Sequence, residues 1–361
     1  MIIPQMEPWL GEEEATAVQD YMRSGGWLME RDKTRQFESI IADYTGASHC
    51  IATVNGTVSL TLAALACDVR PGDEVIVPNY TMIATANSVF MLGATPVFVD
   101  VEPDTLCLDI SRTEAALTAK TRAIMLVTAN GRYPRAGVEA FVDLADKHGL
   151  ILIEDAAQSL GSHFPDGRHI GSVGKVGSFS FSVPKIITTG QGGCLITNDG
   201  ELAERLRKLK DFGRAAGGTD IHQSIGYNFK FTDLQACVGI EQMKKLDWRI
   251  ERKKEILVKY RHALRAVGPV KFFDQDLVNT TPWFIDILCE RRADLQAHLK
   301  QRGIGTRAMY PPVNKQQAYQ RVGDYPVSEL VGRQGLWLPS SSQLTDQQIE
   351  TVCDAVAEFY S

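Results

Sequence analysis

Two parts of one stretch decide the fold: residues 150–159 read LILIEDAAQS, and residues 176–193 read VGSFSFSVPKIITTGQGG. Each part begins as a strand-like run that is followed by a charged side chain, Asp155 in the first part and Lys185 in the second. Charge is costly to remove from water, so a charged side chain at the end of a buried strand requires a partner or a chemical use. We therefore expect a site where these two strands end.

Upstream of this stretch, short apolar runs alternate with segments of helical spacing. The predicted strands are EVIVP (74–78), TPVFVD (95–100), AIMLVTA (123–129) and LILIEDA (150–156), and the predicted helices are TVSLTLAALAC (57–67), TMIATANSVFMLG (81–93) and VEAFVDLADKHG (138–149). Such alternation predicts an α/β fold with a mainly parallel central sheet that is covered on both faces.

Downstream, the pattern changes. SFSFS and GGCLITN predict two strands joined by a TTGQGG turn, and residues 231–264 predict a long helix. The following part mixes helices with antiparallel-looking strands such as WFIDILCE (283–290). Because the change falls at the start of or within the long helix, we divide the chain into a large α/β domain, residues 1–245, and a smaller α+β domain, residues 246–361.

Composition narrows the class of protein. The 361 residues carry a formal net charge of −6, which argues against nucleic-acid binding. The seven cysteines form no CxxC pair, so we expect reduced thiols and no metal site. The sequence contains no signal-peptide pattern and no apolar run near the ~18 residues that span a bilayer, which predicts a cytoplasmic protein without membrane contact.

Asp155 and Lys185 together suit one chemistry. Asp155 alone is explained equally well as a helix cap. Ligands in open α/β sheets lie beyond the carboxyl ends of strands, however, and the ends of consecutive strands can converge there. A lysine can form a Schiff base with the aldehyde of pyridoxal 5'-phosphate, while an aspartate pairs with its pyridine nitrogen. Partial burial would lower the pKa of Lys185 and leave more free amine.

A phosphate site is predicted at residues 52–60, ATVNGTVSL. There an extended run turns into a helix at Gly56 and Thr57, and the amides of a helix N-terminus bind phosphate well. A plain helix cap would show the same pattern. Ser180 and Gln158, close in sequence to Lys185 and Asp155, are candidates for further hydrogen bonds to the cofactor.

Over nearly its full length the chain resembles the DegT/DnrJ/EryC1/StrS family of pyridoxal-phosphate sugar aminotransferases, which have the fold-type I, aspartate-aminotransferase-like fold. The motifs that carry the resemblance occur in the family's order: NGTVSLTLAALA, PGDEVIVPNYTMIATANSV, GATPVFVDVEPDT, IEDAAQSLGSHF, GSFSFSVPKIITTGQGGCLITND, GYNFKFTDLQACVGIEQ and LWLPSSSQLTDQQIE.

The resemblance implies catalytic roles for Lys185, as Schiff-base lysine and proton carrier, and for Asp155. It implies cofactor contacts at Gly56, Thr57, Met82, Asp155, Gln158, Ser180, Lys185 and Asn228, where Asn228 would reach the cofactor phosphate of a neighbouring subunit in a homodimer. The implied reaction passes an amino group from a donor, L-glutamate, to a nucleotide-linked keto-sugar used for surface polysaccharide or glycosides. KIITTGQGG is most similar to the group that aminates GDP-4-keto-6-deoxymannose.

Four features depart from the family pattern. Met82 stands where an aromatic residue is common, and residues 128–137 (TANGRYPRAG) lack the usual histidine and acids and contain two arginines. Lys230 replaces an arginine and Asn314 a histidine. Arginine suits phosphate and carboxylate recognition, which makes the two arginines of this loop candidates for the acceptor. The residues expected to contact substrate are Arg132, Arg135, Lys230, Tyr310 and Asn314.

Four alternatives stay open or are disfavoured. The acceptor is alternatively a small phosphorylated ketone, gripped by Arg132 or Arg135. A cofactor-binding regulator without turnover is a second alternative, which the intact pair of Asp155 and Lys185 disfavours. Family members with histidine in place of the lysine are dehydratases, so the lysine favours transamination. A dinucleotide-binding dehydrogenase is disfavoured because no GxGxxG follows a strand in the first half of the chain.

Overall fold

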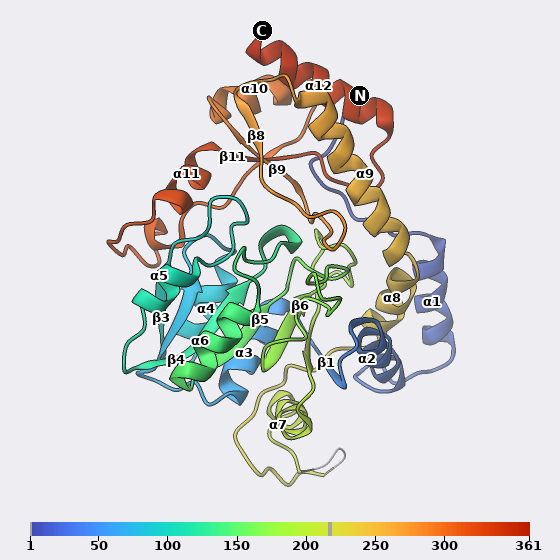
Figure 1. Ribbon diagram of the computed structural model, residues 1–361. Coiled ribbons are helices and arrows are strands. Elements are labelled where there is room, and N and C mark those ends of the chain that lie inside the picture. The colour runs from blue at the N-terminus through green and yellow to red at the C-terminus, as the bar shows by residue number, and fades with distance from the viewer. Residues whose placement is uncertain (1, 216–218) are drawn as a thin grey trace.

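The computed structural model describes residues 2–215 and 219–361, which form a large domain below and a smaller one above in Figure 1. The strands of the larger sheet are β1 (His49–Thr53), β2 (Glu74–Pro78), β3 (Thr95–Val99), β4 (Thr121–Val127), β5 (Ile151–Asp155), β6 (Val176–Ser180) and β7 (Gly193–Thr197). Those of the smaller sheet are β8 (Val270–Phe272), β9 (Ile285–Cys289), β10 (Arg307–Ala308) and β11 (Gly335–Leu338).

The larger sheet is mostly parallel, as predicted. Its strand order is β1-β7-β6-β5-β4-β2-β3, and only β7 runs against its two neighbours in the pairs that the described residues form. Because β1 and β6 are both antiparallel to β7, they run in the same direction, and β5 is parallel to β6. The carboxyl ends of β1, β5 and β6 therefore meet at one edge of the sheet.

Helices cover both faces of this sheet (Figure 1). The helices of the structure are α1 (Glu12–Arg23), α2 (Asp32–Thr45), α3 (Gly56–Ala66), α4 (Ala84–Phe90), α5 (Ile110–Ala115), α6 (Glu139–His148), α7 (Gly200–Lys210), α8 (Asp233–Lys244), α9 (Leu246–Leu264), α10 (Arg292–Gln301), α11 (Pro326–Gln334) and α12 (Asp346–Tyr360). Helices α2, α6 and α8 pack on one face, and α3, α4 and α7 on the other.

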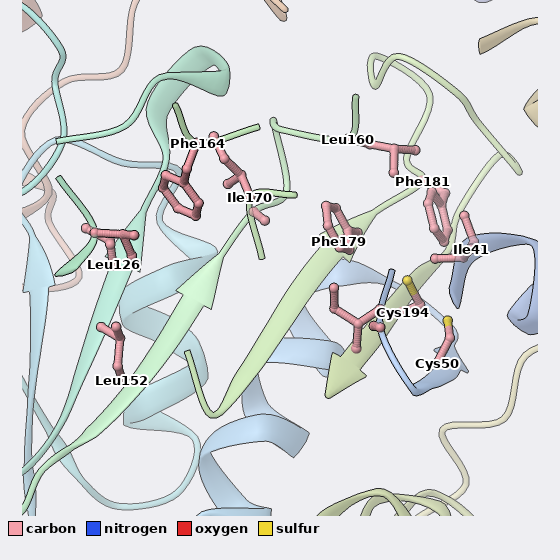
Figure 2. Close-up of a cluster of buried hydrophobic side chains, with 14 of the residues drawn as sticks. Ile41, Cys50, Leu126, Leu152, Leu160, Phe164, Ile170, Phe179, Phe181 and Cys194 are labelled. Carbon is pink, nitrogen blue, oxygen red and sulfur yellow. The ribbon is translucent and has the colours of Figure 1, made fainter. Parts of the chain in front are cut away.

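The core on the first face is built from large aromatic and aliphatic side chains. Figure 2 shows Leu126 and Leu152 on neighbouring strands, with Phe179 on β6 pointing into the same layer. Cys50 and Cys194 lie beside each other in this cluster. All seven cysteines are buried and free, in agreement with the expectation of reduced, buried thiols.

The helix predicted over residues 231–264 is two helices, because α8 ends at Lys244 and α9 begins at Leu246. Helix α9 then runs alongside the upper domain, whose four-stranded sheet has the order β10-β11-β9-β8 (Figure 1). The predicted helix at residues 81–93 is shorter in the structure, where α4 begins only at Ala84. The domain boundary between residues 245 and 246 stays a prediction.

No helix within residues 2–215 and 219–361 combines the length and the apolar character needed to cross a membrane. Over the same ranges, no group of three or more histidine, cysteine or acidic side chains is arranged to hold a metal ion.

Candidate active site

Three strand ends bring the predicted site together. β1 leads directly into α3, β5 ends at Asp155, and β6 ends at Ser180 just before the loop that carries Lys185. Since these ends share one edge of the sheet, side chains from positions 55 to 185 converge there.

At this edge lies a cavity of about 490 Å³. Seven of the eight predicted cofactor contacts line it, and of the predicted substrate contacts Tyr310 does so. Its described lining residues are Asn55, Gly56, Thr57, Val58, Leu60, Thr81, Met82, Ala84, Thr85, Met91, Val127, Asp155, Ala157, Gln158, Ser180, Ser182, Pro184, Lys185, Gln191, Trp283, Arg307 and Tyr310.

Asp155 presents a buried carboxylate to the cavity, with a side chain that is 5% exposed. Its Oδ2 accepts a hydrogen bond from Thr85 Oγ1 (2.7 Å), and its Oδ1 accepts one from the Ala157 amide (3.3 Å). Burial raises the pKa of Asp155, while the bond from Thr85 and the positive charge of Lys185 oppose that rise. A carboxylate desolvated in this way gains strongly from a cationic partner such as a protonated ring nitrogen.

Lys185 supplies an amine to the same cavity. Desolvation lowers the pKa of its amine to about 8; the charge of Asp155 acts in the opposite direction, and that of Arg307 in the same direction. Near neutral pH a larger fraction of this amine is therefore unprotonated than for an exposed lysine. An unprotonated amine is the form that attacks a carbonyl.

The N-terminus of α3 forms the third part of the site. Asn55 caps the helix, since its side chain accepts from the Val58 amide at 2.9 Å. The first amides of a helix have no partner within it, and those of Gly56 and Thr57 lie at the cavity. A Cβ at Gly56 would lie 2.9 Å from the Cβ of Ser180, so only glycine leaves room for this close approach.

These three parts fit pyridoxal 5'-phosphate: an amine for the aldehyde, a carboxylate for the ring nitrogen, and a helix N-terminus with hydroxyl groups for the phosphate. When bound, this cofactor supplies an electron sink for the carbon that gains or loses the amino group. Gln158 also lines the cavity and is held there because its Oε1 accepts from the Asn130 amide at 2.6 Å. Met82 is 45% exposed at the rim, where a thioether can pack against a ring.

The two arginines of the 128–137 loop lie outside the cavity. Arg132 is buried, with Nη2 2.6 Å from Asp286 Oδ1 and Nε donating to the Asp274 carbonyl at 2.8 Å. Arg135 is exposed and pairs with Asp104 and Asp274. The loop docks on the smaller domain instead of pointing into the cavity, so this placement does not support the expectation that Arg132 and Arg135 grip the acceptor.

Three further expected contacts, Asn228, Lys230 and Asn314, are also not among the residues that line the cavity. Lys230 forms an ion pair with Asp211, and Asn228 is exposed beside it. Asn314 is buried, where it accepts from Asn79 Nδ2 at 2.9 Å and donates to the Arg321 carbonyl at 2.9 Å. Asn314 therefore connects two segments of the fold.

Sequence reasoning missed Thr85, Trp283 and Arg307. Thr85 gave a weak signal, because it lies in a helical segment that follows a predicted strand. Trp283 and Arg307 come from the smaller domain, more than 90 residues beyond Lys185, and no local pattern marks them.

Comparisons with known proteins agree with this geometry. The chain is 35% identical to a GDP-perosamine synthase of Escherichia coli O157:H7 over 99% of both chains, and 35% identical to a "pleiotropic regulatory protein" of Geobacillus stearothermophilus over 97% of this chain and 95% of that one. The solved structure of DesV from S. venezuelae, in complex with a ketimine intermediate, superposes with a TM-score of 0.91 at 34% identity and covers 97% of this chain and 94% of its own.

The sequence profile of the DegT/DnrJ/EryC1/StrS aminotransferase family matches residues 8–357. The chain thus belongs to that family and is a pyridoxal-phosphate-dependent sugar aminotransferase.

Proposed function

We propose that this enzyme transfers the amino group of L-glutamate to the keto group of a nucleotide-linked sugar, with a GDP-4-keto-6-deoxymannose-like acceptor favoured. The observation that carries the proposal is the convergence of the Lys185 amine, the Asp155 carboxylate and the N-terminus of α3 on one cavity. The similarity to GDP-perosamine synthases supports a nucleotide-sugar acceptor. A cytoplasmic location and a place in surface-polysaccharide synthesis stay predictions.

Each group at the cavity has a proposed task. Lys185 holds the cofactor covalently at rest and carries the proton at its Nζ during each half of the reaction. Asp155 binds the ring nitrogen and keeps it protonated. The amides of Gly56 and Thr57, with the Ser180 hydroxyl, bind the phosphate.

We also propose that Arg307 binds the α-carboxylate of the donor. Among the described residues that line the cavity, Arg307 is the cation besides Lys185, and no ion pair with a described acidic residue occupies it. Its guanidinium packs over the rings of Tyr310 (5.9 Å) and Trp337 (5.4 Å). It is near enough to Lys185 to lower the pKa of that amine, and the α-carboxylate is bonded directly to the reacting carbon.

Asn228 and Lys230 are proposed to act in the cavity of a second subunit. Asn228 pairs with Asp211 in an isolated bridge, and several described residues between these two positions expose apolar side chains. Ile221 is 67% and Ile225 83% exposed, which favours burial against another copy of the chain. We therefore propose a homodimer with its sites at the interface between the two subunits.

Two rivals need to be separated from the proposal. A small phosphorylated ketone would use the same chemistry, with Arg307 binding its phosphate. A regulator without turnover is suggested by the name of the Geobacillus relative, but the intact set of Lys185, Asp155 and α3 N-terminus opposes it.

The deciding experiment is an absorbance spectrum of the protein loaded with pyridoxal phosphate, before and after addition of L-glutamate. We expect a visible band that glutamate removes and that the correct keto acceptor restores. Candidate GDP-linked keto-sugars and small keto-phosphates are then compared as acceptors. A band that ignores every amino donor would favour the regulator, and restoration by keto-phosphates alone would replace the nucleotide-sugar acceptor.

The dimer is tested by mixing two inactive homodimers, Lys185→Ala and Asn228→Ala, under conditions that exchange subunits. If Asn228 serves the partner's cavity, random exchange makes about one site in four intact in a two-fold symmetric dimer. Mixtures that stay inactive although mass spectrometry shows exchange would contradict the shared site.

A further inference from the structure

Trp283 lies against the amine of Lys185. Its side chain is 3% exposed and forms part of the cavity wall, in the segment that leads into β9 of the smaller domain. The Nζ of Lys185 stands 4.2 Å from the centre of the indole ring. The indole Nε1 donates to the carbonyl of Pro184 at 2.7 Å, so the same side chain also holds the backbone immediately before Lys185.

The indole is itself fixed from behind by the smaller domain. Its ring meets that of Trp337 edge-on, at 5.7 Å between centroids. The backbone carbonyl of Trp283 accepts a hydrogen bond from the Nζ of Lys253 at 2.7 Å, and Lys253 also donates to the carbonyl of Ser340. Lys253 is 2% exposed, and no described acidic residue pairs with it. The two hydrogen bonds satisfy the buried Lys253 amine and connect the backbone at Trp283 with that at Ser340.

We propose that Trp283 is a positioning residue for Lys185: its ring face holds the amine at the cavity wall, and its Nε1–H fixes the peptide that carries the lysine. The large domain thus supplies Lys185, and the smaller domain supplies the surface against which it is oriented. This inference rests on the role proposed above for Lys185 and goes beyond it, because it assigns that orientation to a residue 98 positions away in the sequence.

The ring face has an electrostatic consequence. The charged groups that act on Lys185 are Asp155 on β5, which favours the ammonium, and Arg307 on β10, which disfavours it. An aromatic face attracts an ammonium and so adds to the effect of Asp155. Leucine at position 283 would keep the wall apolar and remove this attraction. The pKa of the Lys185 amine should then fall by about half a unit to one and a half units.

The test uses protein freed of cofactor and measures the rate of covalent capture of pyridoxal phosphate against pH. In the wild type we expect the rate to rise with pH around the pKa of about 8. In Trp283→Leu the profile should shift to lower pH by about half to one and a half units. Its plateau rate should fall by about tenfold because the amine is no longer oriented.

Trp283→Phe serves as the matched variant. It keeps a ring face and loses the bond to Pro184, so its pH profile should stay close to that of the wild type while its plateau falls severalfold. Pyridoxamine phosphate carries no aldehyde for Lys185, so in both variants its affinity should fall by a smaller factor than the capture rate does.

Two results would overturn the inference: capture profiles and plateaus that match the wild type in both variants, or affinity for pyridoxamine phosphate that falls by the same factor as capture. If Trp283→Leu does not fold, the plateau of Trp283→Phe decides, and an unchanged plateau refutes the inference. A wild-type protein that captures no pyridoxal phosphate would instead refute the role of Lys185 itself.

Discussion

Replacing Arg132 by methionine separates a structural role from substrate recognition. Arg132 and Asp286 are only 3% and 4% exposed, and their side chains approach to 2.6 Å. Removing one partner of a buried ion pair leaves an uncompensated charge, which costs about 3–5 kcal/mol. The Asp274 carbonyl also loses its donor, at about 1 kcal/mol.

One consequence of the Arg132→Met substitution raises the free energy of unfolding. Nη1 of Arg132 is buried without an acceptor among the described residues, and its removal relieves about 2 kcal/mol. The free energy of unfolding should therefore fall by about 3 kcal/mol in Arg132→Met. In the double variant with Asp286→Leu the loss should be at most about 1 kcal/mol, because apolar replacement of a whole buried pair is often neutral.

The assay is urea unfolding of the wild type, both single variants and the double variant, with linear extrapolation to water. Arg135→Met is the matched control: its ion pairs are exposed, so the change should be within about 1 kcal/mol. Both half-reactions are measured well below the unfolding midpoint, where Arg132→Met should leave the KM of the acceptor unchanged. A loss below about 1 kcal/mol together with a tenfold higher acceptor KM would refute the structural role.

Three further predictions concern the cavity. Lys185→Ala should lose the visible band and turnover, because Lys185 is the one amine among the described lining residues; normal turnover would contradict the mechanism. Asp155→Asn should lower kcat by at least about a hundredfold, with little change in unfolding free energy. If the free energy of unfolding and the activity both fall instead, Asp155 is mainly a helix cap. Arg307→Gln should raise the KM of L-glutamate by about tenfold, as expected for one lost charge-assisted contact. If the KM of L-glutamate in Arg307→Gln equals that in the control Arg135→Ala, Arg307 does not bind the α-carboxylate of the donor.

Local patterns predicted the elements that carry the site. The strand predicted at residues 150–156 is β5 (Ile151–Asp155), and the helix predicted at residues 57–67 is α3 (Gly56–Ala66). Buried parallel strands are recognisable in sequence because both faces are apolar. The ends of such strands share one edge, so the sequence was sufficient to predict that Asp155 and Lys185 converge.

Positions where the backbone changes direction were less predictable. The break at Lys245 between α8 and α9 has no proline or glycine to mark it, and the residue keeps φ and ψ values of −99° and −2°. Helix α8 and the start of α9, at Leu246 and Ile250, pack in the core of the large domain, whereas the later part of α9, from Ile256 to Leu264, packs in the core of the smaller domain. Such competition between two cores is invisible in a local window.

The sequence by itself thus determined the class of sheet, the place of the site at its edge, and the amine and carboxylate that define the chemistry. The tertiary structure alone decided which residues surround the charged side chains at and near the site. Arg132 forms a buried ion pair with Asp286 and does not line the cavity. Trp283 and Arg307 of the smaller domain line the cavity together with Lys185. The physical reason is that strand identity depends on neighbours in sequence. The partner of a charged side chain depends instead on packing between domains, which brings together residues that lie about a hundred or more positions apart.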